Sequence, residues 1–195
     1  MPGASPDFDG CTFHDNYAIW GGAFADFDGG SARVDNSVFY NNGAEFGGAV
    51  LSAANGLGGS DFRYTTFSEN SATEGGTVWS DGDIQFWFDI IAFSNDGGAF
   101  HYEGGGLPDI ACTNIFGNVE GDWTGPLAGL LASDGNMNSD PQFCGNLGSW
   151  DFRLQSDSPC AHENNSCSSN MGAFGSECGT SASEISNWSR IKRLY

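Results

Sequence analysis

The side chains of this chain that could perform acid–base chemistry are mostly carboxylates. Its 195 residues include 25 Asp and Glu, six Lys and Arg and three His, for a net charge of −19. Glycosidases use two carboxylates roughly 5–10 Å apart, and with this many acids some pair meets that spacing by chance. His14 and His101 stand alone in the sequence, which is more typical of turn or strand-face residues than of a general base. The acids therefore do not by themselves indicate catalysis.

The bases that a polysaccharide lyase needs are scarce. Such an enzyme uses Arg or Lys to remove the acidic proton of the sugar. Between residues 10 and 120 the chain has no Lys, and its Arg residues there are Arg33 and Arg63. A pectin-hydrolase-type site would need Gly-His-Gly, which is absent, and Arg-x-Lys, which occurs as Arg190-Ile-Lys192 near the C-terminus. We therefore predict no catalytic residues.

We also expect no cofactor and no metal-ligating residues. A Ca²⁺ ion is the alternative that the acidic composition leaves open, but the Asp-x-Asp-x-Asp-Gly loop is missing. Scattered acids such as Asp26, Asp28, Asp81 and Asp83 are typical of solvated turns. The negative surface repels nucleic acid and anionic lipid, so we expect neither as a partner.

Three aromatic residues are predicted to bind a ligand. Trp20 and Phe46 stand at equivalent places before a Gly-Gly pair, and Trp87 is the middle residue of Phe86-Trp87-Phe88, a run in which strand alternation exposes at least one ring. Exposed rings can stack on sugars or on a partner protein. Packing against a neighbouring loop is the alternative. The expected partner is a glycan or a cell-surface protein, and the oligomeric state stays open.

A repeated phrase indicates how these residues are positioned. Phe-x-x-Asn with Gly-Gly five residues after the Asn occurs at Phe13, Phe39 and Phe67, and degenerate copies follow at Phe93 and Phe116. A repeat of this length indicates stacked units that share one core. We predict columns of Phe and Asn side chains along the stack, a structural ladder made of Phe13, Asn16, Phe39, Asn42, Phe67, Asn70, Phe93, Phe116 and Asn118.

Within each repeat, short β-branched and aromatic runs alternate with Gly, Asn, Asp and Ser, which is typical of strands and turns. We predict an all-β fold, a single-stranded right-handed parallel β-helix of about five to seven rungs, with rungs about 4.8 Å apart. The helix is expected to span residues 1–179, with an incomplete first rung and closing rungs over residues 140–179. Residues 180–195 are expected to form a linker and a short amphipathic helical tail over 187–195.

The phrase Phe39-Tyr-Asn-Asn42 with Gly47-Gly-Ala-Val50 resembles the polymorphic outer membrane protein repeat of bacterial surface proteins. This resemblance covers residues 10–120 and implies a right-handed parallel β-helix outside the cell, often an adhesin. Residues 140–174 also resemble the closing rungs of secreted bacterial β-helix proteins of pectin-lyase-like fold. The C-terminal membrane barrel of surface autotransporters is absent from the sequence.

Cysteine usage favours an oxidising compartment. Cys144, Cys160, Cys167 and Cys178 cluster near the C-terminus and are predicted to form one or two disulfides, with the pairing open. A zinc site with His162 is the alternative, although no Cys-x-x-Cys pair is present. Cys11 and Cys112 lie about four rungs apart, too far to bond each other, and are expected to be buried thiols, unless Cys11 pairs with a residue upstream of this chain.

The sequence thus predicts an extracellular or bacterial cell-surface module for adhesion or structural display. The first residues resemble the second half of a rung and not a signal peptide, so we expect the C-terminal part of a longer protein. No segment is long and apolar enough to span a membrane. The alternative is a polysaccharide lyase or hydrolase of the pectin-lyase-like class whose catalytic rungs lie upstream.

Overall fold

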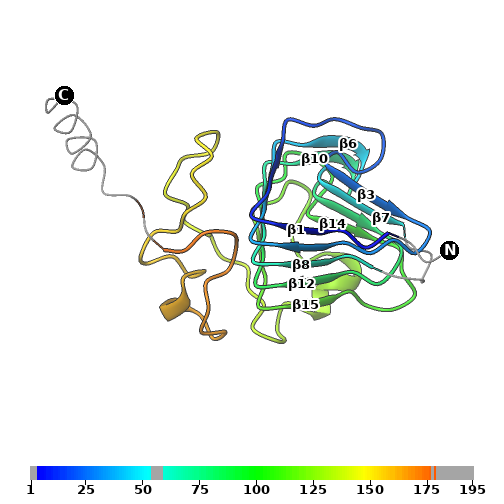
Figure 1. Ribbon diagram of the computed structural model, residues 1–195. Coiled ribbons are helices and arrows are strands. Elements are labelled where there is room, and N and C mark those ends of the chain that lie inside the picture. The colour runs from blue at the N-terminus through cyan, green and yellow to red at the C-terminus, as the bar shows by residue number, and fades with distance from the viewer. Residues whose placement is uncertain (1–3, 54–58, 177, 179–195) are drawn as a thin grey trace, which may run out of the picture.

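The computed structural model of the chain describes residues 4–53, 59–176 and 178. Its short strands run in parallel around a β-solenoid of about four turns (Figure 1). The predicted parallel β-helix is confirmed, but the number of turns is lower than expected because residues 140–176 form no rungs. The hand of the coil stays a prediction, and the tail predicted over residues 187–195 lies outside the described residues. Within the described ranges, no helix is long and apolar enough to cross a membrane.

Each full turn places one strand in each of three parallel sheets, which surround the core. Sheet 1 contains β1 (Asp7–Asp9), β4 (Arg33–Asp35), β8 (Asp61–Arg63), β12 (Gln85–Trp87) and β15 (Asp109–Ala111). Sheet 2 contains β2 (Thr12–His14), β5 (Val38–Tyr40), β9 (Thr66–Ser68), β13 (Ile90–Ala92) and β16 (Asn114–Phe116). Sheet 3 contains β3 (Phe24–Phe27), β7 (Val50–Ala53), β11 (Val78–Ser80) and β14 (Phe100–Tyr102), and a short pair joins β6 (Gly43–Phe46) to β10 (Ser71–Glu74).

The core consists of side-chain columns that run along the solenoid axis. Because strand side chains alternate between two faces, the central residue of each strand in sheets 1 and 2 points inward. In sheet 2 the rings of Phe13 and Phe39 stack with centroids 4.5 Å apart, and those of Phe39 and Phe67 with centroids 4.9 Å apart. The register therefore places these three phenylalanines in one column, as the repeated phrase indicates.

The prediction of the Phe column is wrong for Phe93 and Phe116, which do not point into the core of the solenoid. The register pairs Phe67 with Ile91 and Ile91 with Ile115, so these isoleucines continue the inward column. Phe93 has φ +59° in the turn that follows β13, and Phe116 lies in register with Ala92. The repeated phrase does not mark this column in the later rungs, because these rungs fill the inward position with an aliphatic residue and retain a phenylalanine one or two residues beyond it.

The Asn ladder forms at the turn after sheet 2. Asn16 donates from N and Nδ2 to Oδ1 of Asn42, at 3.2 and 2.9 Å, and Asn42 donates in the same way to Oδ1 of Asn70, at 3.0 Å. Ser94 takes the next place, and its N–H donates to Oδ1 of Asn118 at 3.0 Å. The four predicted Asn residues therefore occupy one column, with a serine between the third and the fourth.

The Gly-Gly pair allows the bend between the short pair β6–β10 and sheet 3. Gly47 has φ +65°, which favours glycine. A Cβ on Gly48 would lie 2.0 Å from the carbonyl oxygen of Gly76 in the next rung. The first glycine is therefore required by its conformation and the second by the close approach of two backbones.

Residues 140–176 pack beside the solenoid and cover the outer face of sheet 2. Phe152 packs on Tyr40, with ring centroids 5.5 Å apart, and Leu154 and Met171 bury Ile90. The N–H of Ala173 donates to Oγ1 of Thr66 at 3.0 Å. This arrangement replaces the predicted closing rungs, and we call residues 140–176 the C-terminal segment.

The disulfides join Cys112 to Cys167 and Cys144 to Cys178. The prediction of disulfides near the C-terminus is thus confirmed, but Cys160 is a buried free thiol. Cys112, which we expected to be a free thiol, is bonded to Cys167. Burial raises the pKa of Cys160 to about 12. Cys11 is free and half-buried. The clustering of cysteines near the C-terminus could not predict that Cys112 takes part in a disulfide. That bond forms because the C-terminal segment folds back along the solenoid.

Candidate binding site

An apolar groove runs along the outside of the solenoid where the turn before sheet 3 meets that sheet. It is a shallow depression of about 270 Å³, and we call it the aromatic groove. The side chains that line it are uncharged and come from successive rungs: Trp20, Phe27, Phe46, Leu51, Ala53 and Trp79. Two of them, Trp20 and Phe27, are large rings that remain 55% and 46% exposed.

The parallel register explains how these residues come together. Trp20 is bridged to Phe46, and Leu51 is in register with Trp79, so each pair occupies equivalent places in neighbouring rungs. The Gly-Gly bend lies between Phe46 and Leu51 in the sequence. It turns the chain so that the two columns line one hollow, with rungs about 4.8 Å apart.

Strand alternation keeps charge out of the groove. On β3, Phe27 points outward, whereas the neighbouring Asp26 points inward and is buried. The hydroxyl of Ser60 donates a hydrogen bond to the Asp26 carboxylate. Burial raises the pKa of Asp26 despite this hydrogen bond. The groove therefore presents aromatic and aliphatic surface to solvent.

Two of the three predicted binding residues lie together, and the third does not. Trp20 and Phe46 line the aromatic groove, whereas Trp87 lies on β12 in sheet 1. The guanidinium carbon of Arg63 lies 4.9 Å from the centroid of the Trp87 ring, so one face of that ring is already occupied. The structure thus separates Trp87 from the groove.

Phe27 and Trp79 are groove residues that the sequence analysis missed. In Gly75-Gly-Thr-Val-Trp79, alternation about the inward Val78 sends Trp79 outward, and it follows the same phrase as Leu51. Alternation about the inward Phe24 and Asp26 sends Phe27 outward in the same way. Reading the alternation through each repeat could therefore have found both residues.

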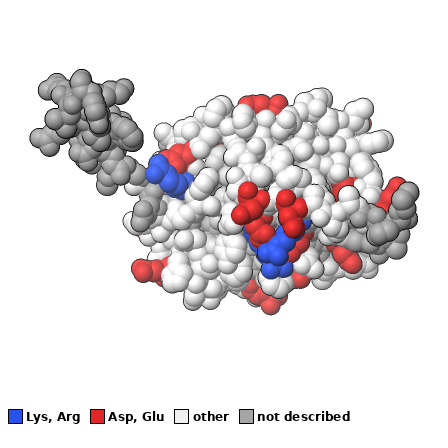
Figure 2. All heavy atoms as spheres, in the orientation of Figure 1, with Lys and Arg blue, Asp and Glu red and all other residues white. Residues whose placement is uncertain are grey.

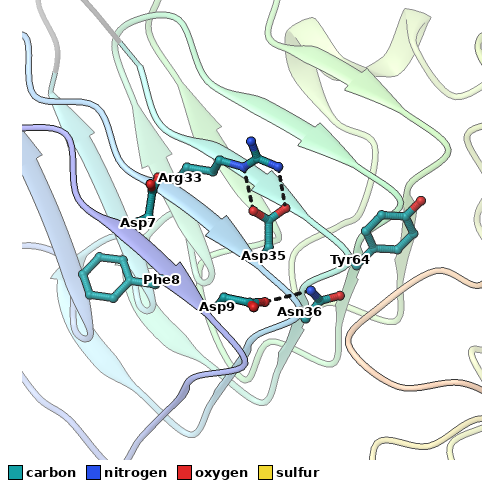
Figure 3. Close-up of a pocket in the computed structure, with 7 residues that line it drawn as sticks. All are labelled: Asp7, Phe8, Asp9, Arg33, Asp35, Asn36 and Tyr64. Atoms are coloured by element: carbon teal, nitrogen blue, oxygen red, sulfur yellow. Dashed lines mark hydrogen bonds and ion pairs between the residues drawn. The ribbon is translucent and has the colours of Figure 1, made fainter.

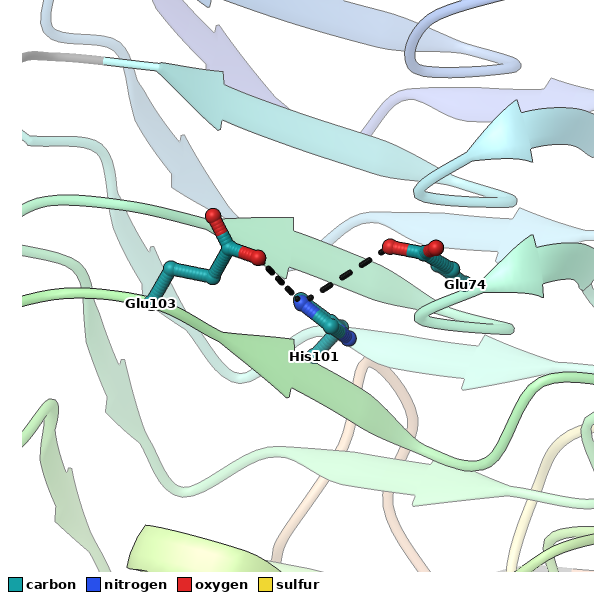
Figure 4. Close-up of side chains that lie close together, drawn as sticks. All are labelled: Glu74, His101 and Glu103. Carbon is teal, nitrogen blue, oxygen red and sulfur yellow. Dashed lines mark hydrogen bonds and ion pairs between the residues drawn. The ribbon is translucent and has the colours of Figure 1, made fainter.

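A polar cluster adjoins the aromatic groove in the later rungs. Nε2 of His101 lies 3.0 Å from Oε1 of Glu103 and 3.8 Å from Oε2 of Glu74 (Figure 4). Glu74 is in register with Phe46, and His101 with Trp79, whose ring is parallel to the imidazole at a centroid distance of 6.2 Å. The columns that line the groove thus continue into this cluster, and His101 is not isolated in the fold.

A second hollow, of about 420 Å³, lies over sheet 1, where acidic and basic side chains gather (Figures 2 and 3). Arg33 Nε donates to Asp35 Oδ2 at 2.6 Å in this hollow, and on the next strand Arg63 Nη2 lies 2.8 Å from Asp61 Oδ2. Each guanidinium is therefore paired with a carboxylate of its own strand. This pairing leaves no net positive charge to attract an anionic ligand.

Comparison of the chain with protein-family models, with curated proteins and with solved structures finds no match. The parallel β-helix that the repeat phrase implies is present, whereas membership of the polymorphic outer membrane protein repeat family stays a prediction.

Proposed function

We propose that this chain is an extracellular β-helix binding module that holds a neutral glycan in the aromatic groove. The observation that carries the proposal is the exposed pair Trp20 and Phe27 beside Trp79, in a hollow without charged lining residues. Flat apolar faces of sugar rings stack on aromatic rings. The repeat of the solenoid supplies rings at equivalent places in neighbouring rungs, which suits a polymer that itself repeats.

The disulfides and the charge support this choice of compartment and ligand. Stable disulfides are typical of secreted and surface proteins, and the two bonds Cys112–Cys167 and Cys144–Cys178 join distant parts of the chain. A net charge of −19 disfavours polyuronates and other anionic polymers. Adhesion to a neutral surface glycan, or display on such a surface, is the role that follows, and the proposal includes no bond cleavage.

The test is a binding screen followed by a paired substitution. The purified chain is first screened on a glycan array, and the best neutral oligosaccharide is then titrated by calorimetry. Replacing Trp20 and Trp79 by Ala should weaken binding at least tenfold, because both stacking surfaces are lost. This change corresponds to about 1.4 kcal/mol.

Trp150→Ala is the matched control. Trp150 is also exposed, at 47%, but it lies on the C-terminal segment against Tyr40, away from the groove residues. Its removal should leave the affinity unchanged. Equal loss in the control and the groove variant, or tighter binding of polyuronates than of neutral glycans, would contradict the proposal.

A further inference from the structure

We infer that Glu74, His101 and Glu103 form a binding site for a divalent transition-metal ion of the Zn²⁺ class. The three side chains each direct one potential ligand atom to a common point, and these atoms lie within 4.8 Å of one another. They come from two parts of the chain, the end of β10 and the region of β14 (Figure 4). The inference does not depend on the ligand of the aromatic groove.

The distances suit a small ion. Zn²⁺ binds imidazole nitrogen and carboxylate oxygen at about 2.0–2.2 Å, which places tetrahedral ligands about 3.4 Å apart. The two distances from His101 Nε2, 3.0 and 3.8 Å, lie on either side of that value. A small rotation of the two glutamate side chains, which are 45% and 57% exposed, would bring all three atoms to bonding distance.

The donor set selects the kind of metal. Ca²⁺ takes six to eight oxygen ligands, whereas imidazole suits Zn²⁺ and its neighbours in the first transition row. Two carboxylates and a neutral imidazole balance the charge of a divalent ion. Three protein ligands at an exposed position leave at least one coordination place open to solvent, as in zinc sites that accept a further ligand.

The arginines among the described residues have aspartate partners of their own. Each described arginine, at positions 33, 63 and 153, is paired with an aspartate two residues away. Glu74 and Glu103 both approach one nitrogen atom of His101, whereas these arginine pairs involve other carboxylates. The Trp79 ring lies parallel to that imidazole at a centroid distance of 6.2 Å.

The competing explanation is a plain ion pair, in which an imidazolium donates to Glu103 alone. It predicts no affinity for metal beyond that of any exposed histidine beside a carboxylate. The chain contains such a pair, His14 and Asp15, whose atoms lie 2.7 Å apart on the first rung. His14 therefore provides a matched control for His101.

The experiment is calorimetric titration of the metal-free chain with ZnCl₂ and, separately, with CaCl₂. We expect one Zn²⁺ per chain and at least tenfold weaker Ca²⁺ binding. His101→Ala should abolish the Zn²⁺ site, and Glu74→Gln and Glu103→Gln should each weaken it at least tenfold. His14→Ala should leave it unchanged. Since the three ligand residues are partly exposed, circular dichroism should show that the variants fold.

Absorption spectroscopy provides a second test that does not rely on calorimetry. Bound Co²⁺ should give visible absorption typical of nitrogen and oxygen ligation, and His101→Ala should remove that signal. Absence of stoichiometric Zn²⁺ binding, survival of binding in His101→Ala, or equal loss in His14→Ala would overturn the inference. Because these readouts use metal alone, they stand whether or not Trp20 and Trp79 bind a glycan.

Discussion

At the scale of single residues, Asp89 is a fully buried carboxylate in the core. It belongs to a column at the turn between sheets 1 and 2, in which a side-chain oxygen accepts the backbone N–H of the previous rung. Thr65 N–H donates to Oδ1 of Asp89 at 2.6 Å, and Thr113 N–H donates to Oδ1 of Asn136 at 3.1 Å. Thr65, Thr113 and Asn136 each also donate to a backbone carbonyl. Oδ2 of Asp89 is buried without a partner.

The ionised form of Asp89 therefore destabilises the folded chain. Burial raises its pKa well above the ordinary value of 3.8, although the hydrogen bond from Thr65 opposes the shift. Because the folded chain binds this proton more tightly than the unfolded chain, the contribution of Asp89 to stability is fully present below pH 3.8. It is lost as the pH rises toward the raised value.

We predict that Asp89→Asn stabilises the folded chain at neutral pH. The amide keeps the acceptor for Thr65 and gains a donor, as Asn136 has in the same column, where its Nδ2 donates to the carbonyl of Ile110 at 2.8 Å. The free energy of unfolding should rise by about 1–3 kcal/mol at pH 7, with a smaller difference at pH 4. Urea denaturation at both pH values measures this change.

Asp109→Asn is the control for that experiment. Asp109 lies on β15 of sheet 1 but is exposed, so its replacement should shift stability by less than about 0.5 kcal/mol. A destabilised Asp89→Asn variant, or a gain that does not depend on pH, would show that Asp89 carries no burial cost.

At the scale of elements, the Asn ladder ties one turn to the next. Asn42 is 1% exposed and bonds in both directions: it accepts from Asn16, and its Nδ2 donates to the carbonyl of Phe13 and to Asn70, each at 3.0 Å. A single amide thus bonds to groups in the rungs on both sides of its own.

We predict that Asn42→Ala destabilises the solenoid by about 1–3 kcal/mol, because it leaves buried partners on both sides unsatisfied. Chemical denaturation measures the loss. Asn95→Ala is the matched control, since Asn95 donates to the Glu69 carbonyl at an exposed position and should cost less than about 0.5 kcal/mol. Equal effects of the two substitutions would rule out a special role for the ladder.

The elements also show how far the sequence predicts this fold. Phe13, Phe39 and Phe67 could be aligned because phrase and spacing agree, and they do share a column. The later rungs could not be aligned by phenylalanine, because Ile91 fills the same inward space with a different side chain. Inward positions require volume and apolar character, and not one residue type. The repeated residue types can therefore no longer be recognised in the later rungs, although these rungs keep the same fold.

The sequence also predicts the candidate site only in part. Trp20 and Phe46 share a place in the phrase, so the sequence could pair them. Trp87 could not be excluded, because which ring of an aromatic run is covered depends on Arg63 of the neighbouring rung. The sequence could not predict the polar cluster for a similar reason: Glu74 and His101 are 27 residues apart and come together only because successive rungs stack.

At the scale of the whole molecule, the disulfide Cys112–Cys167 holds the C-terminal segment against the solenoid across a sequence separation of 55 residues. We predict that replacing both cysteines by Ser lowers the free energy of unfolding by about 2–4 kcal/mol. Residues 140–176 should become the first site of limited proteolysis, while the strands of sheets 1 and 3 stay protected.

Cys11→Ser is the control for the disulfide, because Cys11 is free and lies on the first rung. It should change neither the stability nor the proteolysis pattern appreciably. If the C-terminal segment of the double variant resists protease as well as the parent does, packing on sheet 2 is sufficient without the covalent link.

The way the C-terminal segment lies across the solenoid also sets an order of events during folding. The bonds between neighbouring rungs from Thr65 to Asp89 and from Asn42 to Asn70 span 24 and 28 residues, whereas those from Gly148 to Glu69 and from Ala173 to Thr66 span 79 and 107 residues. Contacts of long sequence separation form later, so the rungs can assemble before this segment docks. Until it does, Val38, Tyr40 and Ile90 face water. Apolar surface that is exposed at this stage favours self-association, and free thiols can pair wrongly, so both processes compete with the final step.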